Sequence, residues 1–367
     1  MSEALLERTR PAETRLKLVD CDIHPVLRSS KALHPYMPHR WREELDARGF
    51  RTRNPFLNAY AYPKAAPALS RRDSWPPGGA PPGGDLDFMR AQHLDHYGVD
   101  IGILQVLGPS GKDMRNQEFG AAVARGLNDW QIAEWTEPEP RLRGSITVTS
   151  DDPDAAVEEI ARCAPKRDFA SVFISARTTE PMGRKRYWPI FAAAVDAGLP
   201  IGIHAGGANG IAMSSAGAPS YYLEDHQSGA AVMQSLLTSL VFEGVFERFP
   251  ALRIVLVEGG FGWLPALLWR MDRQWARMRD EVPHVTRPPS EYVRRNVWVA
   301  TQPIAEPEHA ADMAALLDWI GRDRIVFSSD YPHWDMDDLR LAFKVALSEA
   351  EQRMIFSDNA RAVYRLG

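Results

Sequence analysis

Short apolar runs alternate with amphipathic segments through most of this chain, and that alternation restricts the fold more than any other feature. Strands joined by helix-length segments pair in parallel, because the crossover helix returns the chain to the edge of the sheet where it started. Segments 154–164, 188–198 and 308–321 have the apolar spacing of amphipathic helices. The runs that we predict to be strands are 18–22, 101–105, 143–148, 171–175, 201–204, 254–257, 297–300 and 325–329.

Eight parallel strands with intervening helices predict an α/β fold of the (β/α)8 TIM-barrel type. An open doubly wound sheet is the alternative, but the Gly-rich phosphate-binding turn that follows its first strand is missing here. The chain has 367 residues, 45% of them hydrophobic and 25% charged, which is enough to form one large core. We therefore expect an N-terminal extension over residues 1–16 and a single barrel domain over residues 17–367.

Residues 50–84 do not follow the alternation and are rich in Pro, Gly, Arg and aromatic residues. A long segment without secondary structure inside a compact domain is often a functional lid. We predict a lid or arm after the first strand, with subunit contact as the competing role, and place His34 and His39 on the surface or in the lid. The aromatic side chains of the segment indicate a hydrophobic or aromatic substrate, and its arginines offer anion contacts: Phe56, Tyr60, Tyr62, Trp75, Arg51, Arg53, Arg71 and Arg72.

Charge and cysteine content argue against several classes of protein. The net charge is −5 and no Lys/Arg run stands out, so neither nucleic acid nor an anionic membrane surface is an expected partner. Cys21 and Cys163 are too few for a disulfide framework or a thiolate metal site. No apolar run of about 18 residues could span a bilayer, and the first residues lack the apolar core of a signal peptide. We expect a soluble, cytoplasmic protein.

Acidic and histidine side chains stand at the ends of several predicted strands. Asp22 and His24 are two residues apart and so face the same side of strand one. Strand five ends in His204, strand six in Glu258 and strand eight in Asp330. Alone, each has an ordinary explanation as a strand-end cap, a core histidine or a helix N-cap. Barrel enzymes build their active site at these strand ends, so the shared location favours a site for Zn²⁺, Mn²⁺ or Fe²⁺.

These residues lie in motifs that resemble the amidohydrolase superfamily, specifically amidohydrolase family 2, the branch related to aminocarboxymuconate semialdehyde decarboxylase. The matching motifs are VDCDIH, GLPIGIHAGG, GVFERFPALRIVLVEGGFGWLPALLWRMD and FSSDYPHWD, and the resemblance covers about residues 17–365. It implies a metal-dependent barrel with Asp22, His24, His204 and Asp330 as ligands. Strand four lacks the bridging Lys or Glu of binuclear relatives, so we expect one ion, zinc ahead of manganese or iron.

The chain departs from the family pattern on strand six. Decarboxylases of this family commonly carry a histidine there for acid–base work, whereas this chain has Glu258 followed by two glycines. A glutamate transfers protons at neutral pH if burial raises its pKa. The alternative is a structural glutamate that accepts hydrogen bonds and shapes the loop. His226, near the start of the helix after strand five, competes for the catalytic role or is structural.

Two further side chains are candidates for substrate contact. Arg177 follows strand four and could grip a substrate carboxylate with its guanidinium fork, or pair with Glu180 or another loop acid. His333, three residues beyond Asp330, could orient that aspartate through a hydrogen bond.

The leading hypothesis for function is a non-oxidative decarboxylase acting on an aromatic or unsaturated carboxylic acid. This is largely what the resemblance implies: the metal chelates the carboxylate while Asp330, Glu258 or His226 delivers a proton to carbon. The alternative is a hydrolase or hydratase in which the metal activates water and Asp330 takes its proton, with an ester, lactone, amide or alkene as substrate. A non-catalytic barrel would be expected to have lost ligands, yet all four are present.

The segment GGFGWLPALLWRMDRQWARM predicts a helix that the outer ring of the barrel would not fully cover. Its apolar residues are Trp263, Leu267, Trp269 and Trp275. Because relatives in the family commonly pair, we expect a homodimer.

Overall fold

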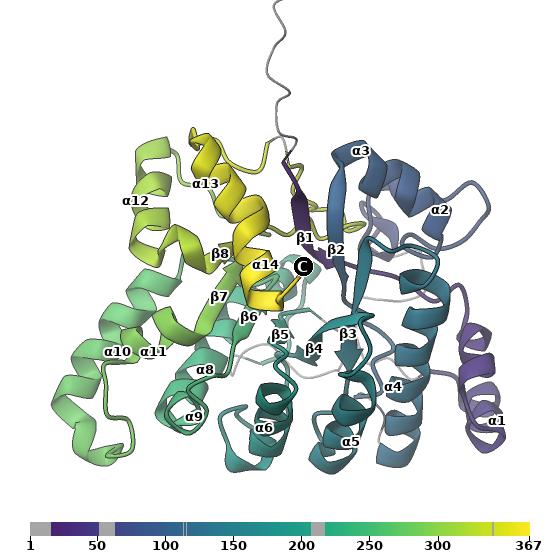
Figure 1. Cartoon of the computed structure of the whole chain (residues 1–367), viewed down its shortest axis with the longest axis horizontal. Helices are drawn as coiled ribbons and strands as arrows, with labels where there is room; N and C mark the ends of the chain where they lie inside the picture. Colours follow the sequence, from purple (N-terminus) through teal and green to yellow (C-terminus); the bar gives the residue numbers. More distant parts are fainter. Residues whose placement is uncertain (1–15, 51–62, 113, 115, 207–216, 340) are drawn as a thin grey trace, which may run out of the picture.

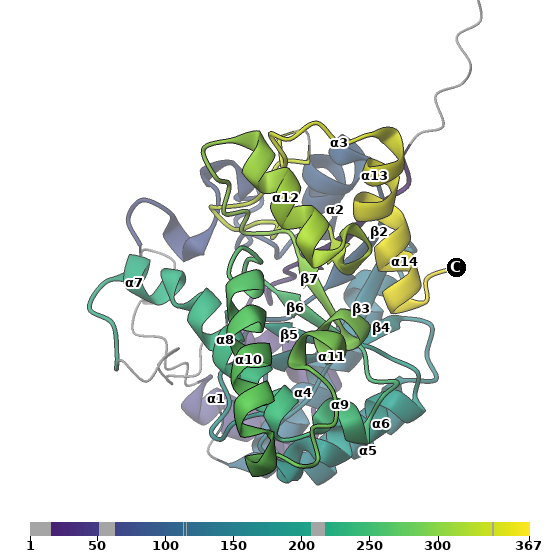
Figure 2. The ribbon, with the colours of Figure 1, turned by 90° about the vertical axis from the view of Figure 1, so that its left-hand side faces the viewer.

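The computed structural model describes residues 16–50, 63–112, 114, 116–206, 217–339 and 341–367. In this part of the chain, eight parallel strands pair in sequence order and helices surround them (Figures 1 and 2). The strands are β1 Leu18–Ile23, β2 Val99–Leu104, β3 Leu142–Thr147, β4 Phe169–Ser175, β5 Ile201–His204, β6 Ile254–Val257, β7 Val297–Ala300 and β8 Ile325–Val326. The ring closes between the β8 segment and β1, where the amide of Cys21 donates to the carbonyl of Phe327 at 3.0 Å. The predicted (β/α)8 barrel is confirmed.

Most of the helices connect successive strands and pack outside the ring, and the last two follow the eighth strand. Three of them fall where amphipathic spacing predicts them, and α5 begins where Asp152 accepts a hydrogen bond from the amide of Ala155 at 3.1 Å, directly before Pro153. None of the described helices is both long and apolar enough to cross a membrane. Their bounds are α1 His39–Arg48, α2 Leu86–Met89, α3 Asp95–Tyr97, α4 Gln117–Gln131, α5 Pro153–Cys163, α6 Trp188–Asp196, α7 Tyr222–Gln227, α8 Gly229–Phe242, α9 Val245–Arg248, α10 Leu264–Met278, α11 Pro289–Asn296, α12 Ala310–Ile320, α13 Glu349–Arg353 and α14 Asn359–Tyr364.

The last strand is shorter than its apolar run predicts. We expected a strand over 325–329, but only Ile325–Val326 forms β8. Beyond it, backbone amides turn to side chains: Ser328 N–H donates to Oγ1 of Thr301 at 3.0 Å, and Ser329 N–H donates to Oδ1 of Asp20 at 2.9 Å. The prediction is wrong for 327–329, because side-chain oxygens replace the backbone partners of a regular strand there.

The barrel interior is apolar beneath the site. Val257 is the register partner of His204, so the two side chains leave the sheet on the same face. Val257 belongs to a buried cluster with Cys21 and Trp298, and α14 contributes Val363 and Tyr364 to that cluster. A second and larger apolar layer separates the strands from the outer helices. The strand ends on the opposite side from α14 are therefore where polar side chains can collect.

A bulge in β1 changes which side chains reach the interior. Asp20 pairs with Gly102 and Ile23 with Leu104, so three steps along β1 match two steps along β2. One extra residue in a strand interrupts the alternation of its side chains between the two faces, and bulges often re-aim side chains beside active sites. Here Cys21 packs in the interior cluster and Asp22 contacts the inward-facing His204. Asp20 instead contacts His93, which precedes β2.

The Pro/Gly-rich segment is described from residue 63 onward and lies along the loop after β8. Ser70 forms an antiparallel bridge with His333, and the amide of Trp334 donates to the carbonyl of Leu69 at 3.0 Å. Its action as a lid or arm stays a prediction. Arg51, Arg53, Phe56, Tyr60 and Tyr62 lie outside the described residues.

Candidate metal centre and adjoining cavity

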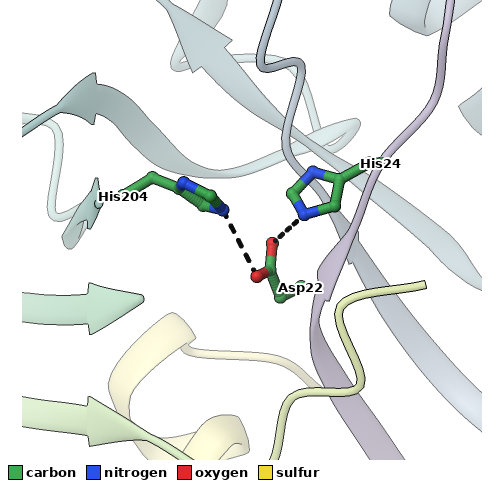
Figure 3. Close-up of side chains that lie close together, drawn as sticks. All are labelled: Asp22, His24 and His204. Atoms are coloured by element: carbon green, nitrogen blue, oxygen red, sulfur yellow. Dashed lines mark ion pairs between the residues drawn. The ribbon is translucent and has the colours of Figure 1, made fainter. Parts of the chain in front are cut away.

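Three side chains meet at the ends of β1 and β5 (Figure 3). Nε2 of His24 lies 3.1 Å from Oδ1 of Asp22, and Nε2 of His204 lies 3.4 Å from Oδ2 of the same carboxylate. Both imidazoles point at Asp22, and all three side chains are at most 2% exposed. The strand ends thus converge as the sequence predicts.

Asp330 completes a four-residue set, Asp22, His24, His204 and Asp330, which we call the donor cluster. Its Oδ1 lies 2.8 Å from Nε2 of His24. Two neighbours hold the carboxylate in place: Nδ1 of His333 donates to Oδ1 at 2.6 Å, and the amide of Gln302 donates to Oδ2 at 3.1 Å. The orienting hydrogen bond predicted for His333 is therefore present. Within the described residues, His333 stacks on His24 and does not line the cavity described below.

The electrostatics of the donor cluster favour a bound cation. Burial works against charge on His24, but the carboxylates of Asp22 and Asp330 raise its pKa well above the ordinary value. Burial likewise disfavours the ionised form of Asp330, yet His333 and His24 lower its pKa overall. Burial also works against charge on Asp22, but His24 and His204 lower its pKa, so two buried carboxylates stay ionised and draw positive charge to the space between them.

The donor atoms suit a divalent metal ion. Those of Asp22, His24 and His204 lie within 4.8 Å of one another, and so do those of His24, Asp330 and His333, with His24 common to both groups. Both carboxylate oxygens of Asp22 and Nε2 of His204 are buried without a hydrogen-bond partner among the described residues, which is costly unless another group satisfies them. On His24, Nδ1 donates to the carbonyl of Gln105 at 2.8 Å and so turns Nε2 toward the cluster. Imidazole and carboxylate donors together suit zinc, manganese or iron. β4 ends in Ser175, which supports one ion and not a bridged pair.

A cavity of about 450 Å³ adjoins the donor cluster and carries the remaining predicted residues. Arg177, His226 and Glu258 line it together with Trp263 and Tyr222. Arg177 is 6% exposed, and its guanidinium lies 3.1 Å from Asp225. The acid that pairs with Arg177 is therefore Asp225 on α7, while Glu180 pairs with Arg184 and Arg186.

Glu258 links the cavity to the donor cluster. Its Oε2 lies 3.1 Å from Nδ1 of His204, and its side chain is 15% exposed. Burial raises the pKa of Glu258, and the adjacent His204 offsets only part of that rise. The carboxyl packs directly against a glycine, because a Cβ on Gly206 would come within 2.6 Å of Oε2. Oε2 has no hydrogen-bond partner among the described residues, so the structural alternative rests on its ion pair with His204.

His226 enters the cavity through a contact that the sequence does not indicate. It lies in the short helix α7, the first described helix after β5, and its Nε2 is 2.9 Å from Oδ2 of Asp335. Asp335 raises the pKa of His226, and burial offsets part of the effect. Gln302 joins this pair to the donor cluster, because its amide nitrogen also lies 3.0 Å from Oδ2 of Asp335.

Sequence reasoning missed Gln302, Asp335 and Asp225. Gln302 had the best available signal, since it follows the apolar run of β7 as other site residues follow their strands. Asp335 and Asp225 lie in loops or short helices after the barrel strands, where neither periodicity nor spacing places a side chain. Their roles depend on contacts with residues far away in the sequence.

Comparisons with known proteins agree with this fold. A family model described as Amidohydrolase matches residues 19–366. The chain is 28% identical over 296 residues to a gamma-resorcylate decarboxylase of Rhodococcus jostii (strain RHA1), covering 77% of this chain and 88% of that protein. It is 26% identical over 271 residues to a 2-keto-4-carboxy-3-hexenedioate hydratase of Sphingobium sp. (strain NBRC 103272 / SYK-6), covering 68% and 73% respectively.

A solved structure covers nearly the whole fold. The 5-carboxyvanillate decarboxylase of Novosphingobium aromaticivorans superposes with a TM-score of 0.74 at 21% identity, over 97% of this chain and 98% of that one. That crystal structure contains manganese and 4-hydroxy-3-methoxy-5-nitrobenzoic acid.

Proposed function

This chain belongs to the amidohydrolase family, and we propose that it is a metal-dependent, non-oxidative decarboxylase of an aromatic carboxylic acid. The observation that carries the proposal is the buried donor cluster beside a cavity lined by three ionisable side chains. Arg177 is a cation, and Glu258 and His226 can carry a proton. The decarboxylases of Rhodococcus jostii and Novosphingobium aromaticivorans support the reaction class.

The donor cluster would hold one divalent ion. Such an ion supplies Lewis-acid chemistry, withdrawing electron density from the substrate oxygens that it contacts. Zinc is the ion first expected from the sequence, but we propose manganese. The manganese in the Novosphingobium enzyme supports this choice, as does a donor set that is half carboxylate.

Arg177 and His226 bind the acidic substrate in this proposal. The guanidinium of Arg177 is already held by Asp225, so little side-chain entropy is lost when it grips a carboxylate or phenolate. His226 adds a second positive charge, because Asp335 raises the pKa of its imidazole. A cavity of about 450 Å³ lies within the usual size range of small-molecule sites.

Glu258 is the proposed proton donor to carbon. As the bond between the ring carbon and the carboxyl carbon breaks, its electron pair stays on the ring carbon, which takes the proton from Glu258 while CO₂ leaves. Burial raises the pKa of Glu258, which favours the protonated form that this step needs. Asp330, the third proton carrier considered from the sequence, fits a ligand better because its pKa is lowered.

Hydration is the second candidate function, and the Sphingobium hydratase relative supports it. The same donor cluster would face a water molecule, and Glu258 or Asp330 would exchange protons with it. Both reactions use an acidic substrate, so Arg177 and His226 keep the same roles.

The test is product formation by protein reconstituted with manganese or zinc. CO₂ release from a panel of hydroxybenzoates and muconate-type acids is expected to exceed any release of acid from matched esters and lactones. The panel should also include unsaturated dicarboxylates, followed for loss of the alkene absorbance. His204→Ala is expected to lose both metal and activity. Loss of the alkene without CO₂ would replace the decarboxylase with a hydratase, and acid release alone would indicate a hydrolase.

A further inference from the structure

We propose that Asp20, Ser329 and His93 form a positioning clamp. This hydrogen-bonded group fixes the metal ligand Asp22 on β1 relative to the metal ligand Asp330 after β8. The affinity for metal would then depend on a carboxylate that does not itself face the ion. This inference rests on the proposed function only in requiring a metal at the donor cluster.

The β1 bulge separates Asp20 from the donor cluster. Asp22 contacts His204 inside the ring, whereas Asp20 contacts His93 on the π-helical turn Arg90–Leu94 before β2. π-helical turns of this kind occur often at functional sites. Asp20 is fully buried, and a buried carboxylate is stable only when its oxygens are well satisfied.

The carboxylate of Asp20 links β1 to the segment that follows β8. Oδ1 of Asp20 accepts the amide of Asp22 at 3.2 Å and the amide of Ser329 at 2.9 Å. Oδ2 accepts the hydroxyl of Ser329 at 2.5 Å and Nε2–H of His93 at 2.7 Å. One of these amides belongs to Asp22, and the other belongs to Ser329, which directly precedes Asp330. The position of one ligand relative to the other therefore depends on Asp20.

Ser329 extends the clamp around Asp330. Its hydroxyl oxygen accepts the amide of Tyr331 at 3.1 Å, so the hydrogen bond spans Asp330, whose φ is +66°. The ring of His93 stacks on Tyr331 at 4.6 Å, and the Tyr331 hydroxyl donates to Gln92 at 2.9 Å. Contacts of Ser329 and Tyr331, the residues on either side of Asp330, therefore hold the Asp330 backbone in its left-handed conformation.

The residue types match those of a serine hydrolase, but the geometry does not. The hydroxyl of Ser329 donates to the carboxylate of Asp20, and Nε2 of His93 lies 3.5 Å from that hydroxyl. Ser329 is 1% exposed and His93 is 2% exposed, and neither lines the adjoining cavity. A nucleophile needs access to substrate, so the cluster acts on the ligands and not on a substrate.

The test compares metal affinity in variants that differ in this clamp. Ser329→Ala removes the hydroxyl, and Asp20→Asn replaces one acceptor oxygen with a donor. The matched control is Ser171→Ala on β4, which removes a buried hydroxyl that donates to Ser145 on β3 at 2.8 Å. We expect both clamp variants to bind Mn²⁺ about 10–100-fold more weakly by electron paramagnetic resonance titration, as is typical when partners of metal ligands are lost. Ser171→Ala is expected to bind within about twofold of wild type.

A second measurement needs no metal. Hydrogen–deuterium exchange of residues 327–333 in the metal-free protein is expected to be faster in Ser329→Ala than in wild type or Ser171→Ala. Unchanged affinity in both clamp variants would overturn the proposal, as would unchanged exchange in this segment. If wild-type protein bound no metal, the proposed function would fail together with the effect of the clamp on metal affinity, and faster exchange in Ser329→Ala would then support only the positioning of residues 327–333.

Discussion

Glu258 and Asp330 both have positive φ angles, +55° and +66°, which residues with side chains rarely adopt. Such conformations cost of the order of 1–3 kcal/mol and persist where the surrounding structure holds them. Asp330 has Ser329 and Tyr331 to hold it, and aspartate tolerates this region better than glutamate does. A glutamate kept in this conformation agrees with the requirement for a proton donor that we propose at position 258.

Glu258→Gln tests that requirement. The change keeps the shape of the side chain and removes its transferable proton, so kcat for CO₂ release is expected to fall about 10²–10⁴-fold. Bound metal, measured by mass spectrometry of the dialysed protein, is expected to stay at the wild-type ratio. Glu247→Gln on α9, outside the cavity, is the control and should retain kcat. A kcat near wild type in Glu258→Gln would assign the proton to another group.

The pH dependence of substrate binding tests His226. Asp335 raises the pKa of His226, so the imidazole stays charged above its usual range and loses its proton as pH rises through the raised value. KM is therefore expected to increase with pH across that value. Asp335→Asn removes the main cause of the shift and should move the increase in KM to lower pH. An unchanged KM profile in Asp335→Asn would remove His226 from substrate binding.

At the scale of elements, the apolar runs predicted the strands because burial decides where strands form. The bounds of β5, β6 and β7 are those predicted, since each of these apolar segments pairs along its length with other buried strands. The bulge in β1 and the early end of β8 could not be predicted. The bulge follows Asp20 and the strand end precedes Ser329, and these two residues, 309 apart in the sequence, are hydrogen-bonded to each other. The donor cluster was predictable because strand ends share one edge, whereas Gln302 and Asp335 depend on loop conformation.

The loop after β8 carries a second pH-sensitive group, Asp337. Its amide donates to the carbonyl of Ser329 at 3.0 Å, and its Oδ2 accepts the amide of Ile304 at 3.3 Å. Burial raises the pKa of Asp337 to about 7, from 3.8 in its ordinary state. Between these values the folded protein keeps a proton that the unfolded chain has lost, so the stability contributed by this group decreases as pH rises from about 4 to about 7.

Asp337→Asn is expected to remove that decrease, because asparagine does not ionise. The free energy of unfolding of the variant, measured by urea denaturation, should exceed that of wild type at pH 8 and approach it near pH 4. Asp318→Asn, at an exposed position on α12, is the control and should follow the wild-type curve. A variant that is less stable than wild type at pH 8 would show that the ionised carboxylate is well satisfied in the fold.

At the scale of the whole molecule, one aromatic side chain on the outer ring lacks cover. Trp269 on α10 is 58% exposed, and its ring lies 5.4 Å from that of Trp319 on α12. The other residues expected to be uncovered, Trp263, Leu267 and Trp275, are partly buried against the core. The surface available for a partner is therefore narrower than the sequence indicated, and it centres on Trp269. The two helices that carry Trp269 and Trp319, α10 and α12, lie on the same side of the barrel (Figure 1).

A second copy of the chain is the expected partner at Trp269. Tryptophan anchors contribute strongly to protein interfaces, so wild-type protein is expected to have twice the monomer mass by light scattering at micromolar concentration. Trp269→Lys should give the monomer mass with an unchanged circular dichroism spectrum, because the side chain lies outside the core. Leu341→Lys, at a position 76% exposed and outside both helices, should remain dimeric. A wild-type monomer would refute the homodimer, and a dimeric Trp269→Lys would place its interface elsewhere on the barrel.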